Sequence, residues 1–339
     1  MEKIESVFLK SINFVILGDY NSIAGELGKK GTATDIAIYD RKTSDVIYTW
    51  AAPVTFPDKI QSLMQTVNIA EYAILNVTKI DKYLGEQIIA LDSVDFKDGF
   101  ILHSYEVDEE KLRTLIKNTS VSHFKFLDNT DQLKQEISRL ESKVYEGPVM
   151  IPVDHAFDVK GVGTVVLGVV KQGTVKVYDQ LRIMPAGSDI VVKSIQMHDD
   201  PVHESKSPAR VGLAIKGMTA EQISRGDVLC LPNSSYMKTI PAAGTTTTTT
   251  TTTISTDPTI STTKFVKNSY YKGDLAENQT YLISVGLQIK PVRLKIVNGT
   301  TVEKIIPESK PIVFVPGQIY VLLKPDSQGT RIIGKGILE

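Results

Sequence analysis

The stretch between residues 151 and 230 constrains the fold of this chain most, because its apolar runs are short and rich in β-branched residues. Gly, Asp, Ser and Pro separate these runs, and no segment has the periodicity of a helix. β-branched residues favour strands, and glycines inside strands mark the bulges and corners that a small barrel needs in order to close. Gly161 and Gly163 flank Val162, and Gly168 follows closely. The stretch therefore predicts a β-barrel of short strands.

The N-terminal part of the chain, residues 1–147, has a different pattern, in which strand-like and helix-like segments alternate. Apolar runs predict strands at residues 12–18, 36–39, 46–50 and 72–77. Apolar residues at helical spacing predict helices at residues 58–71, 83–92, 109–117 and 129–142. Such alternation predicts a mostly parallel sheet covered by helices, that is, an α/β domain.

A phosphate-binding loop would be expected directly after the first strand of such a domain. Its chemistry needs Gly-x-x-x-x-Gly-Lys-Ser/Thr, in which backbone N–H groups approach phosphate, the lysine reaches the terminal phosphates and the hydroxyl binds magnesium. Gly18 and Asp19 follow the strand, but Ile23 and Ala24 stand where the motif has Gly and Lys. Because the spacing itself is lost, the sequence predicts that no functional phosphate loop is present.

The C-terminal part, residues 262–339, returns to short strands separated by turn signals. Asn298-Gly299 between two apolar runs is a strong hairpin signal. The repeated short strands predict a further β-barrel over residues 262–339. Residues 233–261 contain an unbroken threonine run, Thr245 to Thr253. Low-complexity threonine has no apolar face to bury, which predicts a flexible linker or surface loop. Because threonine favours strands, an extended hairpin is the alternative.

Composition limits the compartment and the chemistry. The single cysteine, Cys230, excludes internal disulfides and suits a reducing cytosol. No apolar run approaches the ~20 residues that span a bilayer, and the N-terminus lacks a signal-peptide pattern, so we expect a cytoplasmic protein with no membrane partner. The net charge is −1, so RNA binding would depend on local basic patches. The His and Cys residues do not have the spacing of metal ligands, so the sequence indicates no metal site. It also contains no nucleophile and base at a spacing that would indicate a catalytic site.

Four blocks in the barrel stretch, taken in order, resemble the second domain of translational GTPases. They read DVKGVGTVVLGVVKQGTVKV, IQMH, VGLAIKG and ISRGDVL. The resemblance points to the branch of elongation factor Tu and the selenocysteine-specific elongation factor SelB, and the layout resembles the archaeal SelB-like subgroup named EF-Pyl. It implies a degenerate, GTPase-like α/β domain over residues 1–147 and two β-barrels, over residues 148–232 and 262–339, joined by residues 233–261. We expect no C-terminal winged-helix extension.

The resemblance also locates two further nucleotide motifs, and both are degenerate. The magnesium-binding Asp-x-x-Gly falls on Ala52-Pro53-Val54-Thr55-Phe56, which contains neither Asp nor Gly. The guanine-reading Asn-Lys-x-Asp falls on His103-Ser104-Tyr105-Glu106. Gly18, Asp19 and Glu106 then remain as remnants of a nucleotide site. The implication is a pseudo-GTPase with no catalytic residues and no GTP cofactor; an elongation factor that binds GTP through unorthodox residues is the alternative.

In this family the second domain holds the 3′-terminal adenosine of an aminoacyl-tRNA. Carried over by motif, the pocket comprises Val159, Val165, Gln196, His198, Arg210 and Ala214. Gln196 stands where elongation factor Tu has a carboxylate, and its amide can still donate to or accept from adenine or ribose. The implied partner is tRNA, aminoacyl-tRNA or the ribosome. Alternatively, the valines are barrel core, His198 is a surface residue and the chain is a protein-interaction scaffold.

Overall fold

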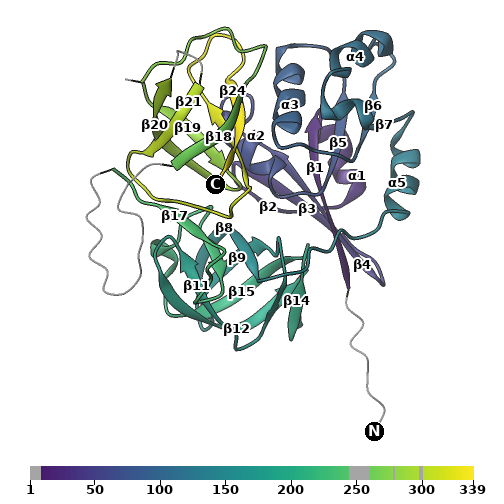
Figure 1. Ribbon diagram of the computed structural model, residues 1–339. Coiled ribbons are helices and arrows are strands. Elements are labelled where there is room, and N and C mark those ends of the chain that lie inside the picture. The colour runs from purple at the N-terminus through teal and green to yellow at the C-terminus, as the bar shows by residue number, and fades with distance from the viewer. Residues whose placement is uncertain (1–8, 244–259, 278, 298–300) are drawn as a thin grey trace.

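The structure, a computed structural model, describes residues 9–243, 260–277, 279–297 and 301–339. An α/β region is followed by two β-barrels, which confirms the predicted fold class (Figure 1). The barrel of the second region, residues 148–232, is called the second barrel, and that of the third region, residues 262–339, is called the third barrel. The second barrel lies below the other two regions in this view, and the third barrel lies beside the α/β region. The run Thr245 to Thr253 and the predicted turn Asn298-Gly299 lie outside the described residues.

One seven-stranded sheet of order β2-β3-β4-β1-β5-β6-β7 forms the centre of the α/β region. β1 pairs in parallel with β4 and β5, and β6 and β7 continue the parallel set, whereas β2 and β3 pair antiparallel at one edge. The strands are β1 (Lys10–Gly18), β2 (Lys29–Ala33), β3 (Ile36–Lys42), β4 (Val46–Pro53), β5 (Tyr72–Val77), β6 (Gly99–His103) and β7 (Lys125–Leu127). β1 and β5 are almost entirely buried, as expected for central strands covered on both faces.

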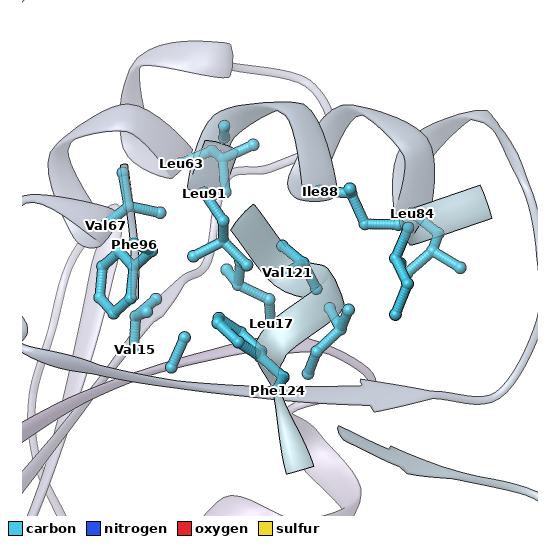
Figure 2. Packing of buried hydrophobic residues seen from close by; sticks show 14 of the residues in the cluster. Val15, Leu17, Leu63, Val67, Leu84, Ile88, Leu91, Phe96, Val121 and Phe124 are labelled. Atoms are coloured by element: carbon cyan, nitrogen blue, oxygen red, sulfur yellow. The ribbon is translucent and has the colours of Figure 1, made fainter. Parts of the chain in front are cut away.

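Helices cover both faces of this sheet. They are α1 (Asn21–Leu27), α2 (Ile60–Val67), α3 (Lys82–Ser93), α4 (Glu109–Ile116) and α5 (Thr130–Ser138). α1 and α5 pack with the aromatic residues Phe14 and Trp50 on one face. α2, α3 and α4 pack on the other face, where Leu17 of β1 meets Leu63 and Leu91 (Figure 2). α3 begins where the Asp81 side chain accepts from the backbone N–H groups of the first turn.

The second region closes into a barrel. Six strands form the ring β11-β16-β8-β9-β15-β12, the pairing of β11 with β12 closes it, and β13 is attached to β12. Val166, Leu213 and Ile195 lie opposite one another on β9, β15 and β12 and face the core. The strands are β8 (Met150–Val159), β9 (Gly163–Val169), β10 (Thr174–Lys176), β11 (Gln180–Met184), β12 (Ser188–Met197), β13 (Asp200–Val202), β14 (Glu204–Lys206), β15 (Arg210–Lys216) and β16 (Val228–Cys230).

The third region is a closed barrel of order β18-β21-β20-β19-β23-β24. Its strands and the adjoining pair β17–β22 are β17 (Lys238–Ile240), β18 (Ile260–Lys267), β19 (Tyr281–Val285), β20 (Gln288–Val297), β21 (Thr301–Pro307), β22 (Ile312–Phe314), β23 (Ile319–Leu323) and β24 (Ile332–Leu338). The expectation that residues 233–261 form a linker or loop is wrong in part, because β17 and the start of β18 lie within this range. Ile240 of β17 is buried in the core of the third barrel, which explains the pairing.

Polar contacts with little solvent exposure join the α/β region to the second barrel. Lys171 Nζ donates to Glu71 Oε1 at 2.8 Å, and the Glu71 side chain is 4% exposed. Arg225 forms an ion pair with Asp35 and donates to Gln65 Oε1 at 3.2 Å. Asp35 lies in the β2–β3 turn, Gln65 lies in α2 and Glu71 lies just before β5. These contacts link three parts of the α/β region to two separate loops of the barrel, so they fix its orientation.

The third barrel is joined to the α/β region in the same way. Gln65 Nε2 donates to the carbonyl of Leu287 at 3.0 Å, and Arg331 forms an ion pair with Glu86 of α3. Val321 and Ile332 of this barrel belong to the same buried apolar cluster as α2 and α3. Within the residues that the structure describes, no helix is both long and apolar enough to cross a membrane.

Candidate functional site

The connection between β1 and α1 is only two residues long. Only Asp19 and Tyr20 separate the end of β1 from the start of α1. Gly18 has φ +76°, and a Cβ at this position would lie 1.9 Å from the carbonyl oxygen of Asn76. The Gly18 N–H donates to Gln87 Oε1 at 3.1 Å, and the Asp19 N–H donates to the Asn76 carbonyl at 2.9 Å. Both backbone N–H groups are thus already bonded within the protein.

A pocket of about 320 Å³ lies at the carboxyl ends of β1 and β5, beside Gly18 and Asp19. Its apolar wall includes Phe56 and Tyr83, whose rings meet edge to face with centroids 6.1 Å apart. Its charged residues are Asp19, Asp81 and Lys79. Two carboxylates against one ammonium give the lining of the pocket a net negative charge.

Glu106 is separated from the other two remnants of the nucleotide site. It is exposed in the connection between β6 and α4, accepts from the Tyr105 hydroxyl at 3.1 Å and does not line the pocket that contains Gly18 and Asp19. Phe56, the last residue of the segment on which the Asp-x-x-Gly motif falls, does line it. The structure therefore brings Gly18, Asp19 and Phe56 together and leaves Glu106 apart.

The residues carried over to the tRNA pocket lie mainly on the outer face of the second barrel. Val165 lies opposite Ala214 in the β9–β15 register, and Gln196 lies opposite Gly212 in the β15–β12 register. Val159 ends β8 on the same face, because β8 and β9 pair through Val159 and Gly163. Val159 and Val165 are partly exposed and are not in the barrel core.

Two residues of this set, Arg210 and His198, contact acidic side chains within the protein. Arg210 forms an ion pair with Asp154, and both side chains are largely buried. His198 lies in the turn after β12 with φ +49°, and its Nε2 is 3.2 Å from Asp40 Oδ1 of β3. Near Arg210, the α/β region covers the barrel and leaves a cavity of only about 20 Å³. The accessible part of the face is therefore the end that carries Val159 and Val165.

Sequence reasoning missed the aromatic residue at this accessible end. Phe157 of β8 lies opposite Val165, is 37% exposed and has its ring 5.7 Å from that of His155. Val162 at the tip of the β8–β9 turn is 41% exposed. The alternation of His155, Phe157 and Val159 along β8 is the signal that places all three on one face.

Basic side chains flank the same end of the barrel face. Lys160 is exposed in the β8–β9 turn, and Lys193 of β12 is exposed while its Nζ donates to the Val162 carbonyl at 2.7 Å. An exposed aromatic ring on a surface that also carries lysines is a common arrangement for contacting single-stranded nucleic acid. Among the described residues, no group of three or more His, Cys, Asp and Glu side chains is placed to hold a metal ion.

Comparison with known proteins supports the relationship that the barrel motifs indicate. The family model "Elongation factor Tu domain 2" matches residues 163–230. The selenocysteine-specific elongation factor of Methanocaldococcus jannaschii is 32% identical over 171 residues, which are 43% of this chain and 35% of that protein. The structure of translation elongation factor SelB from Methanococcus maripaludis in complex with the GTP analogue GPPNHP superposes with a TM-score of 0.78 and 22% identity. That superposition covers 98% of this chain and 79% of the other.

One relative matches along the whole chain. It is an uncharacterized protein of Methanocaldococcus jannaschii, 32% identical over 332 residues, which are 97% of this chain and 100% of that protein. The matching family model, the SelB sequence match and the SelB fold agree on the wider group. This chain therefore belongs to the same family as the Methanocaldococcus jannaschii protein, within the SelB-like branch of the translational GTPase superfamily.

Proposed function

We propose that this protein is a cytoplasmic elongation-factor-like protein that binds the acceptor end of tRNA or aminoacyl-tRNA without using GTP. The observation that supports it best is the accessible end of the outer face of the second barrel, which carries Phe157 and Val165 together with Lys160 of the β8–β9 turn and Lys193, whose Nζ donates to that turn. A ring of this kind stacks on a base, while the ammonium groups contact the backbone phosphates.

The β1–α1 connection supports the second half of the proposal. A phosphate loop offers free backbone N–H groups to the ligand, whereas the N–H groups of Gly18 and Asp19 are bonded to Gln87 and Asn76. Asp19 itself adds negative charge beside the pocket. The chain is on this account a pseudo-GTPase, and it binds its RNA partner in one fixed arrangement of its three regions.

Titration of the purified protein with labelled tRNA tests this function. We expect binding that is unchanged by GTP and magnesium and that weakens steeply as salt rises, because phosphate contacts release counterions. Phe157→Ala should weaken binding by about 1–3 kcal/mol, roughly 5- to 150-fold, since base stacking on an aromatic ring is lost. Tyr105→Ala is the matched control, because Tyr105 is 94% exposed and lies in the α/β region.

Three results would contradict the proposal in different ways. Binding of tRNA only when GTP is present would mean that other residues hold the nucleotide, as the unorthodox GTP-binding alternative requires. Absence of tRNA binding at low salt would favour a protein-interaction scaffold. Equal losses in Phe157→Ala and Tyr105→Ala would mean that the barrel face is not the contact surface.

A further inference from the structure

The pocket beside Gly18 and Asp19 has a position and a set of side chains that point to a ligand other than a nucleotide. β1 leads into α1 on one face of the sheet and its neighbour β5 leads into α3 on the other face. Ligands of open α/β sheets bind in the crevice where neighbouring strands diverge in this way. The pocket, about 320 Å³, lies there and falls within the range of small-molecule sites, about 300–1,000 Å³.

Two buried amide side chains line this pocket, and each uses only one end of its amide within the described residues. Gln87 is 6% exposed; its Oε1 accepts from the Gly18 N–H at 3.1 Å, and its Nε2 has no described acceptor. Asn76 is 8% exposed; its Nδ2 donates to the Asp19 carbonyl at 2.9 Å and to Ser22 Oγ at 2.8 Å, and its Oδ1 has no described donor. Gln87 Nε2 thus remains as a hydrogen-bond donor, and Asn76 Oδ1 as an acceptor, for a ligand.

Charge in the pocket narrows the class of ligand. The Asp81 carboxylate is paired with Lys79 at 3.0 Å, whereas the Asp19 carboxylate has no ion-pair or hydrogen-bond partner among the described residues. An unpaired carboxylate beside a free amide oxygen favours an ammonium group and disfavours a carboxylate or phosphate. Phe56 and Tyr83 form an apolar wall next to these groups.

We infer that this pocket binds a small α-amino acid amide or ester. The ammonium group of the ligand is held by Asp19 and Asn76 Oδ1, its carbonyl accepts from Gln87 Nε2, and its side chain lies against Phe56 and Tyr83. The free acid is excluded, because its carboxylate would lie among the carboxylates of Asp19 and Asp81. This site goes beyond the proposed function and does not depend on tRNA binding by the barrel.

Calorimetric titration of the full chain with phenylalaninamide tests the inference, with phenylalanine and 3-phenylpropionamide as the two comparison ligands. We expect the amide to bind and both comparison ligands to bind at least tenfold more weakly, because phenylalanine has a carboxylate in place of the amide and 3-phenylpropionamide lacks the amine. No binding of the amide at millimolar concentration, or equal binding of all three, would overturn the site.

Variants and competition locate the binding. Asp19→Asn should weaken phenylalaninamide at least tenfold, while Asp45→Asn, an exposed carboxylate outside the pocket, should leave it unchanged. Both variants should keep wild-type tRNA affinity, which separates failure of this site from failure of the proposed function. Equal effects of the two variants would overturn the role of Asp19. Competition between aminoacyl-tRNA and the amide would overturn the assignment to a free small molecule.

Discussion

Glu86 of α3 and Arg331 of the third barrel form a buried ion pair across the junction of two regions. Arg331 Nε lies 3.1 Å from Glu86 Oε1, Nη2 donates to Oε2, and the two side chains are 6% and 12% exposed. Arg331 Nη1 also donates to the carbonyl of Pro57 at 2.7 Å. The guanidinium therefore fastens the barrel both to a helix and to the loop before α2.

Removing one partner of this pair should destabilise the whole chain. Glu86→Ala leaves the Arg331 charge buried and unpaired, and the expected loss of unfolding free energy is about 3–5 kcal/mol. Chemical denaturation monitored by circular dichroism measures it. Glu110→Ala, at an exposed position of α4, should change stability by less than about 0.5 kcal/mol. Similar losses in both variants would mean that the ion pair does not fasten the junction.

Gly18 and Gly25 provide a matched pair for the β1–α1 connection. Gly18→Ala should cost more than about 2 kcal/mol, because the residue has φ +76° and the new Cβ would strike the Asn76 carbonyl. Gly25→Ala, inside α1 with open space around it, should stabilise by about 0.5–1 kcal/mol. Thermal denaturation of the two variants tests this, and a tolerated Gly18→Ala would mean that the connection can move away from β5.

The salt dependence of tRNA binding should depend on the lysines of the barrel face. Lys160→Ala removes one phosphate contact, so the slope of log affinity against log salt should fall by about 1. Lys117→Ala, an exposed lysine after α4, should leave the slope unchanged. Titrations at four salt concentrations give both slopes, and an unchanged slope for Lys160→Ala would place the phosphates elsewhere.

Tyr72 should make the protein sensitive to alkaline pH. Burial, with the charge of Asp98 as the next cause, raises the pKa of Tyr72 to about 12 from 10. The folded state keeps the proton between these values while the unfolded state loses it, so this contribution is fully present below pH ~10 and is lost as pH rises toward 12. Tyr72→Phe should therefore flatten the decline in stability over this range relative to the unchanged protein. Denaturation at several pH values measures both profiles.

A GTP analogue should leave the arrangement of the three regions unchanged. The contacts Lys171–Glu71, Arg225–Asp35 and Arg331–Glu86 hold both barrels. On the function proposed above, a nucleotide has no phosphate loop through which to alter these contacts. Small-angle scattering with and without the analogue and magnesium should give superimposable profiles. A change in radius of gyration on adding the analogue would contradict this expectation.

The elements that sequence patterns predicted well were those with a long buried face. β1 and β5 consist mainly of apolar residues and are almost entirely buried, and the short β-branched runs between residues 151 and 230 predicted the second barrel. α1 was missed because it has only seven residues and contains Gly25, and β2 was missed because its sequence, KKGTA, is polar at a sheet edge. Both depend on packing with the rest of the α/β region more than on local preference.

The candidate site was less predictable, because some of its side chains contact acidic residues that are far away in the sequence. Arg210 meets Asp154, and His198 meets Asp40, so neither side chain is available in the way that motif comparison suggested. Motif comparison aligns residue types but carries no information on such long-range pairs. Phe157 directly precedes the first of the four quoted blocks, so motif comparison passed over it. The alternation along β8 and its register against β9 place Phe157 on the same face as Val165.

The pairing of Glu86 with Arg331 also affects the order in which the regions of the chain complete their folding during synthesis. The two residues are 245 positions apart, and the face of α2 and α3 that they adjoin is covered by Val321, Leu323 and Ile332. Because ribosomes make the N-terminal part first, the α/β region leaves the exit tunnel with an apolar face uncovered and a carboxylate unpaired. Completion of the last hairpin is therefore the step that protects the nascent chain from aggregation.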